Sequence, residues 1–150
     1  MNNKKNFFVY IVSVSYLFVY SGILFLSYDS LSDIVPTHIN YNGQVDGYNN
    51  KIHLWYAILV NFILLLLYLF LLKNPEKCNY PIKITDENRE KMYYKMKLFV
   101  SYLSVITSVL FSFMIFNALK YEYKNIIVII TFIIIIPILL VNFINFKYFK

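Results

Sequence analysis

The side chains best suited to chemistry lie in one polar stretch, residues 34–51, between two long apolar runs. His38, Asp46 and Lys51 bring an imidazole, a carboxylate and an ammonium group into this stretch. A histidine beside a carboxylate can exchange protons, form an ion pair or bind a metal ion. A metal site normally has three or four ligands, and the nearest third candidate is His53. Two interpretations therefore stay open: a binding surface, and a metal or catalytic site.

The other reactive side chains lack the partners that catalysis needs. Cys78 is the only cysteine, so no internal disulfide can form. The sequence has no CxxC pair, no HExxH motif and no glycine-rich phosphate loop. Four serines share one helical face, but no base accompanies them, so we interpret them as a helix-packing stripe: Ser101, Ser104, Ser108 and Ser112.

The backbone of the polar stretch is restricted by turn-forming residues. Pro36 disfavours a helical conformation at the residue before it, which predicts an extended chain. Asn42-Gly43 and Asp46-Gly47 are both turn dipeptides, which favours a short hairpin. We expect a compact cap on the outer ends of the membrane spans, in which Asp46 contacts either His38 or Lys51.

The composition predicts an all-α integral membrane protein with a single transmembrane domain, residues 1–150. Hydrophobic residues make up 59% of the chain, charged residues only 15%, and the mean hydropathy is +0.57. A soluble domain carries about 25% charged residues. A helix needs about 20 apolar residues to cross the lipid bilayer. Four uncharged segments meet this length and predict a four-helix bundle: residues 7–27, 53–72, 98–119 and 126–146.

The basic residues predict how the spans are oriented. Eleven of the fourteen Lys and Arg residues flank the spans on the side of both termini, and three lie on the other side. Because basic loops stay in the cytoplasm, we expect cytoplasmic termini and an outer 34–51 loop, in the inner membrane of a bacterium. The net charge of +6 lies at the span ends rather than in a stripe, which argues against a nucleic-acid partner.

Polar residues inside the spans indicate how the helices pack. Asn61 lies in the middle of the second span, where an amide must point to another helix. Pro137 is expected to kink the fourth span. Before the third span, Thr85 is placed as an N-cap, so that a cytoplasmic helical extension starts at about Asp86. A small transporter component, with Asn61 and the kink along its path, is a further alternative. The lack of charged residues in the spans weighs against ion coupling.

Two motifs resemble a known family. The outer loop carries Ile34-Val35-Pro36-Thr37-His38, then Gly43, Asp46-Gly47 and Lys51. The inner connector carries Asn79-Tyr80-Pro81 followed by Thr85 and Asn88. Together, over residues 15–115, they resemble the domain of unknown function 1648 family, which forms the N-terminal part of SdpI-type membrane proteins. After its four spans the chain is expected to lack their additional C-terminal region, so the resemblance is at the level of the domain.

The resemblance implies a function in recognition. SdpI-type proteins protect bacteria against a secreted toxin of their own and take part in its signalling. A similar role here would make the outer loop a recognition element for a peptide, a toxin or another membrane protein. No catalytic activity, metal or cofactor is implied. The positions to which the family pattern points are His38, Asn40, Gly43, Asp46 and Lys51.

Overall fold

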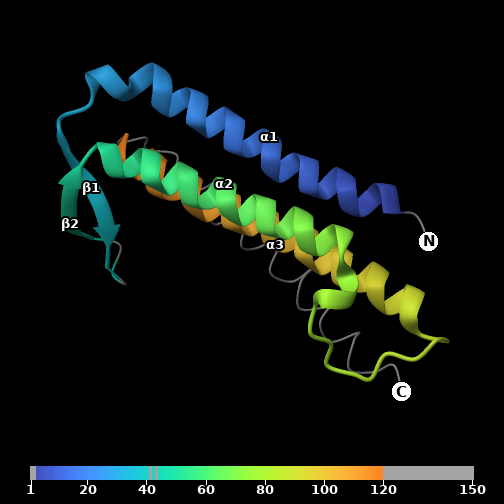
Figure 1. Cartoon of the computed structure of the whole chain (residues 1–150). Coiled ribbons are helices and arrows are strands. Elements are labelled where there is room, and N and C mark those ends of the chain that lie inside the picture. The colour runs from blue at the N-terminus through green and yellow to red at the C-terminus, as the bar shows by residue number, and fades with distance from the viewer. Residues whose placement is uncertain (1–2, 41, 43, 120–150) are drawn as a thin grey trace.

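Three long helices and one hairpin form the part of the chain that the structure describes. The structure is a computed structural model, described here for residues 3–40, 42 and 44–119. The helices α1, α2 and α3 lie side by side (Figure 1), and each is long and apolar enough to cross a membrane. Their bounds are Asn3–Ser27, Ile52–Lys73 and Arg89–Ala118. The predicted fourth span, 126–146 with Pro137, lies outside the described residues.

Large apolar side chains point away from the three-helix bundle. On α1, for example, Phe18, Phe25 and Leu26 are 69%, 70% and 84% exposed. Contiguous apolar surface of this kind is rare on a soluble protein. It is expected where lipid replaces water as the solvent, because lipid does not drive such side chains inward. The outward faces therefore indicate a membrane protein.

The interior of the bundle is held by small and polar side chains. Ser13, Ser101, Ser104 and Ser108 are completely buried, which lets the helix backbones approach closely. Hydrogen bonds between helices run along this interior. They join Tyr10 Oη to Leu65 O (3.0 Å), Ser13 Oγ to Ser104 Oγ (2.9 Å), Ser112 Oγ to Tyr16 Oη (3.1 Å) and Tyr68 Oη to Thr107 Oγ1 (2.9 Å).

Asn61 occupies the centre of this polar interior and is fully buried. Its Nδ2 donates to Tyr20 Oη on α1 (2.5 Å) and to Ser108 Oγ on α3 (3.2 Å). One side chain of α2 thus links all three helices. Tyr and Ser on neighbouring helices are the kind of partners that an amide in a lipid environment needs.

A two-stranded antiparallel sheet accompanies the helices, so the part of the chain that the structure describes is mostly helical and not all-α. The strands β1 (Ile34–Ile39) and β2 (Val45–Asn50) pair with each other between α1 and α2. A 3-10 helix, Tyr28–Ser30, joins α1 to the sheet. Val35 on β1 is buried in the hydrophobic core, and β1 contacts α3, so the sheet is attached to one end of the bundle (Figure 1).

The helical extension of the third span is shorter than predicted, because α3 begins at Arg89 and not near Asp86. The side chain of Asn88 accepts a hydrogen bond from the Thr85 amide (2.9 Å) and donates to Lys83 O (3.1 Å). These bonds hold the preceding residues in a turn. Asn88, rather than Thr85, is the N-cap residue.

The two ends of the bundle differ in charge. The start of α1 and the connector between α2 and α3 lie at the end opposite the hairpin (Figure 1). The basic side chains described at this end are Lys5, Lys73, Lys77, Lys83, Arg89, Lys91, Lys95 and Lys97, and they outnumber the acidic ones, Glu76, Asp86, Glu87 and Glu90. The hairpin end has Lys51 together with Asp29, Asp33 and Asp46. In membrane proteins, the loops on the cytoplasmic side carry an excess of Lys and Arg, and the two ends of this bundle differ in the same way.

Candidate recognition hairpin

The hairpin, residues 34–50, brings His38 and Asp46 together. Nδ1 of His38 bonds to Oδ1 of Asp46, across eight positions of sequence. Both side chains remain accessible, with 71% of His38 and 43% of Asp46 exposed. Of the two contacts expected for Asp46, with His38 or with Lys51, the structure shows the one with His38. It presents an imidazole and a carboxylate as one unit on the surface.

Two irregularities in the strand pairing create this contact. Pro36 pairs with Tyr48 and His38 with Gly47, so one extra residue lies on β1. Ile39 then pairs with Val45, so Asp46 is the extra residue on β2. A bulge of this kind turns a side chain away from the regular alternation of a strand. Asp46 can therefore reach His38, although the residue paired with His38 is Gly47.

Gly47 has a role other than the turn predicted for Asp46-Gly47. Both residues lie within β2, and the chain reverses earlier, between Asn40 and Gln44. A Cβ atom on Gly47 would lie 2.7 Å from Cβ of His38, closer than side-chain carbons can approach. The glycine is needed here because the two strands come close together at His38.

Asn40 organises the reversal of the chain. Its Oδ1 accepts hydrogen bonds from the amides of Asn42 and Gln44, both at 3.0 Å. The Asn40 amide in turn donates to Gln44 O (2.8 Å). Such bonds from an asparagine side chain to the following backbone are typical of turns. Asn40 thus acts on the backbone of the hairpin, and Gly43 lies outside the described residues.

Lys51 secures the base of the hairpin and does not pair with Asp46. Its Nζ lies 3.3 Å from Oδ1 of Asp33 and donates to Leu31 O (3.2 Å). The ammonium group also lies over the ring of Tyr28, 5.0 Å from the centroid. The Lys51 side chain is only 18% exposed. It joins the start of α2 to the segment that follows α1. In the sequence, the only sign of this role is the opposite charge of Asp33.

His53 is separate from the His38–Asp46 pair. Its Nδ1 lies 2.9 Å from Asn50 O, and its ring packs edge-on against Tyr56 one turn further along α2. In residues 3–40, 42 and 44–119, no three His, Cys, Asp or Glu side chains gather as a group that could hold a metal ion. The geometry therefore lends no support to the alternative of a metal site with His53 as third ligand.

The hairpin also exposes apolar side chains. Tyr48 and Ile34 are 61% and 57% exposed, although both lie in paired strands. Nearby, Asn49 Nδ2 donates to Thr37 Oγ1 across the strands (2.8 Å). A mixture of exposed tyrosine, aliphatic and polar side chains on a rigid backbone is typical of surfaces that bind other proteins.

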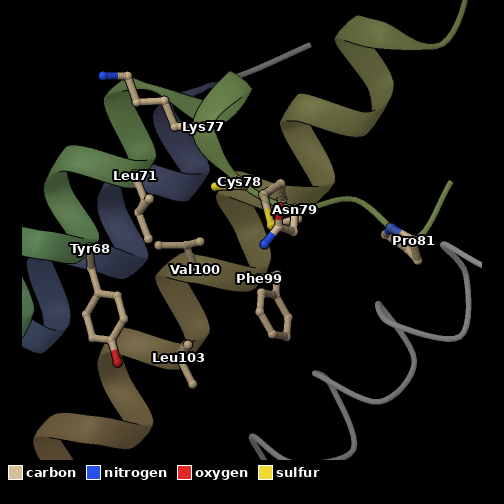
Figure 2. A pocket seen from close by; sticks show the side chains of 10 residues that line it. Tyr68, Leu71, Lys77, Cys78, Asn79, Pro81, Phe99, Val100 and Leu103 are labelled. Atoms are coloured by element: carbon tan, nitrogen blue, oxygen red, sulfur yellow. The ribbon is translucent and has the colours of Figure 1, made fainter. Parts of the chain in front are cut away.

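A cavity of about 380 Å³ lies beside the connector (Figure 2). The connector is at the end of the bundle opposite the hairpin (Figure 1). Tyr68, Phe99 and Leu103 form its apolar walls, and Cys78 and Lys77 lie at its connector side. Burial raises the pKa of the Cys78 thiol, and the nearby carboxylate of Glu76 raises it further. The thiol is therefore protonated at neutral pH and a poor nucleophile.

Comparison with known proteins identifies part of the chain. Residues 17–65 match the family model described as "Domain of unknown function (DUF1648)". The match includes the end of α1, the whole hairpin and the first half of α2, and it confirms the family resemblance of the outer loop. The predicted family-like region, 15–115, was longer and included a motif in the inner connector. The match does not extend to that connector. Neither the curated proteins nor the solved structures contain a significant match.

Proposed function

We propose that this protein is a membrane-embedded binding or signalling protein that uses its hairpin to recognise a polypeptide partner. The observation that carries the proposal is the exposed His38–Asp46 pair on a hairpin fixed to the bundle at both of its ends. Val35 packs into the core on one side, and Lys51 joins Asp33 and Tyr28 on the other. Binding residues are commonly found on loops that a rigid scaffold holds in position.

The exposed groups favour a partner with both polar and apolar side chains. The His38–Asp46 pair can form charge-assisted hydrogen bonds to a cationic or hydroxyl group. Tyr48 and Ile34 offer exposed apolar area on the same hairpin. A peptide, including a peptide toxin, or the exposed segment of another membrane protein supplies these groups together. A partner of this kind agrees with the immunity role of SdpI-type proteins.

The proposal places the hairpin outside the cytoplasmic membrane of a bacterium, with the N-terminus and the connector inside. The concentration of basic side chains at the end opposite the hairpin supports this orientation. A secreted toxin or an extracytoplasmic segment of another protein would then meet the His38–Asp46 pair directly. The C-terminus is placed inside as well, on the basis of the predicted fourth span.

Site-specific photocrosslinking in intact cells tests the proposal. A photoreactive amino acid in place of Tyr48 is expected to give a discrete crosslinked polypeptide, whose yield falls at least fivefold when Asp46→Asn is added. The same amino acid in place of Leu59, an exposed apolar residue in the middle of α2, is the control. Equal products from the two positions, or a product at Tyr48 that Asp46→Asn leaves unchanged, would contradict recognition by the hairpin.

A further inference from the structure

A groove lies at the basic end of the bundle, where all three helices meet. Its volume is about 210 Å³, and it is lined by Asn6 and Phe7 of α1, Leu69, Leu72 and Lys73 of α2, and Lys97 of α3. Two lysines and one asparagine thus line the groove together with three apolar residues. The hairpin and the cavity at Cys78 share none of these residues.

The three polar residues of the groove all lie at the ends of the predicted membrane spans. Asn6, Lys73 and Lys97 each lie one residue beyond the ends of the uncharged spans 7–27, 53–72 and 98–119. The apolar Phe7, Leu69 and Leu72 lie on the span side of these ends. The groove therefore changes from polar to apolar where the headgroups of a bilayer give way to the acyl chains.

Asn6 has an unused hydrogen-bond acceptor. The residue is 2% exposed, and its Oδ1 is buried without a hydrogen-bond partner among the described residues. Its Nδ2 lies 3.5 Å from Tyr94 O, and its backbone carbonyl accepts a bond from Ser101 Oγ (2.8 Å). Because this oxygen is buried, a ligand donor reaches it only when the Asn6 side chain turns toward the groove, and the new bond would then remove the cost of a buried acceptor without a partner.

We propose that this groove binds the headgroup of an anionic phospholipid that carries hydroxyl groups, as phosphatidylglycerol does. The phosphate lies between the ammonium groups of Lys73 and Lys97. A headgroup hydroxyl donates to Asn6 Oδ1, and an acyl chain follows Phe7, Leu69 and Leu72 along the bundle. Because the site joins residues from α1, α2 and α3, a bound lipid also holds the three helices together at this end.

The apolar half of the groove favours a lipid over a free phosphate compound. A soluble phosphate ester would leave Phe7, Leu69 and Leu72 uncovered, whereas a phospholipid covers them and satisfies the polar atoms. Hydroxyl donors distinguish the headgroup from phosphatidylcholine, which has no donor and no net charge. The site therefore discriminates between lipids by charge and by hydrogen bonding.

Native mass spectrometry of the purified protein in detergent, titrated with phosphatidylglycerol or phosphatidylcholine, tests the site. Each lysine near a headgroup contributes about 1 kcal/mol. The double variant Lys73→Ala/Lys97→Ala is therefore expected to bind phosphatidylglycerol about 30-fold more weakly than the unaltered protein. The matched control is Lys83→Ala/Lys91→Ala, which removes the same charge from the connector end without touching the groove. This control is expected to keep the affinity within threefold.

The milder double variant Lys73→Gln/Lys97→Gln serves if the alanine variant fails to fold. It removes both positive charges but keeps long polar side chains, and it is expected to weaken phosphatidylglycerol binding at least tenfold. Equal losses in the groove and control variants would show attraction to charge in general and overturn the site. Equal binding of phosphatidylcholine would do the same. Displacement of the lipid by glycerol 3-phosphate at similar concentration would assign the groove to a soluble phosphate and overturn the lipid assignment.

Discussion

Gly47 and His38 face each other across the hairpin, so close that a Cβ atom on Gly47 would lie 2.7 Å from that of His38. Gly47→Ala must therefore push the strands apart at the position where Asp46 reaches His38. Overpacking of this kind costs about 1–3 kcal/mol. Hydrogen exchange of the β1 and β2 amides is expected to become faster in the variant.

The matched control for this prediction is Gly22→Ala on α1. A Cβ atom on Gly22 has no neighbour within 4 Å, and alanine is the better helix former. Hydrogen exchange in the hairpin should therefore be the same as in the unaltered protein. Unchanged exchange in Gly47→Ala would show that the strands do not approach closely at His38.

Asn61→Leu is expected to lower the stability of the bundle only modestly. The substitution removes the bonds to Tyr20 and Ser108, and interhelical bonds in membranes average about 0.6 kcal/mol each. Thermal unfolding in detergent should therefore show a loss of roughly 1 kcal/mol. A loss of binding at the hairpin without any change in unfolding would show a functional role for Asn61 instead.

Lys51→Met is expected to loosen the base of the hairpin more than Asp33→Asn does. The lysine makes contacts with Leu31, Tyr28 and Asp33, whereas Asp33 is 83% exposed. An exposed ion pair contributes little by itself, so neutralising Asp33 should have a small effect. Protease cleavage within residues 31–50 of the detergent-solubilised protein compares the two variants. Equal cleavage rates would show that Lys51 acts through Asp33 alone.

Orientation in the membrane is tested with cysteines in a Cys78→Ser background. Asn49→Cys, on the exposed side of β2, is expected to react with an impermeant thiol reagent in intact cells. Glu87→Cys, in the connector, should react only after the cells are permeabilised. The opposite pattern would reverse the proposed topology and move the hairpin into the cytoplasm.

Cys78 itself is expected to react slowly and with a marked pH dependence. Because burial and Glu76 raise its pKa, less thiolate is present at pH 7.5 than in an ordinary cysteine. The thiolate fraction grows as pH rises toward the raised pKa, so labelling should accelerate between pH 7.5 and 9.5. In a Cys78→Ser background, the exposed Asn79→Cys serves as the reference in permeabilised cells. Equal rates for both cysteines across this range would contradict the buried position of the thiol.

Much of the helical part of this protein could be predicted from the sequence, because span length and polarity are local properties. An uncharged run such as 53–72 meets the thickness of a bilayer whatever the rest of the chain does, and α2 ends within one residue of it on either side. The same holds for the polar stripes, whose helical spacing predicts that they face other helices. A short hairpin was predicted as well, although Asp46-Gly47 lies within β2 and not in its turn.

The contacts between segments were decided only by the tertiary structure. The residues Asp46, Lys51 and His38 allow several ion pairs, and the two strand bulges select the one between Asp46 and His38. Lys51 is left for Asp33 and Tyr28 because the chain brings them together at the base of the hairpin. The groove of Asn6, Lys73 and Lys97 exists only once three helices align. The bulged pairing of the two strands and the alignment of the three helices depend on contacts between segments that are far apart in the sequence.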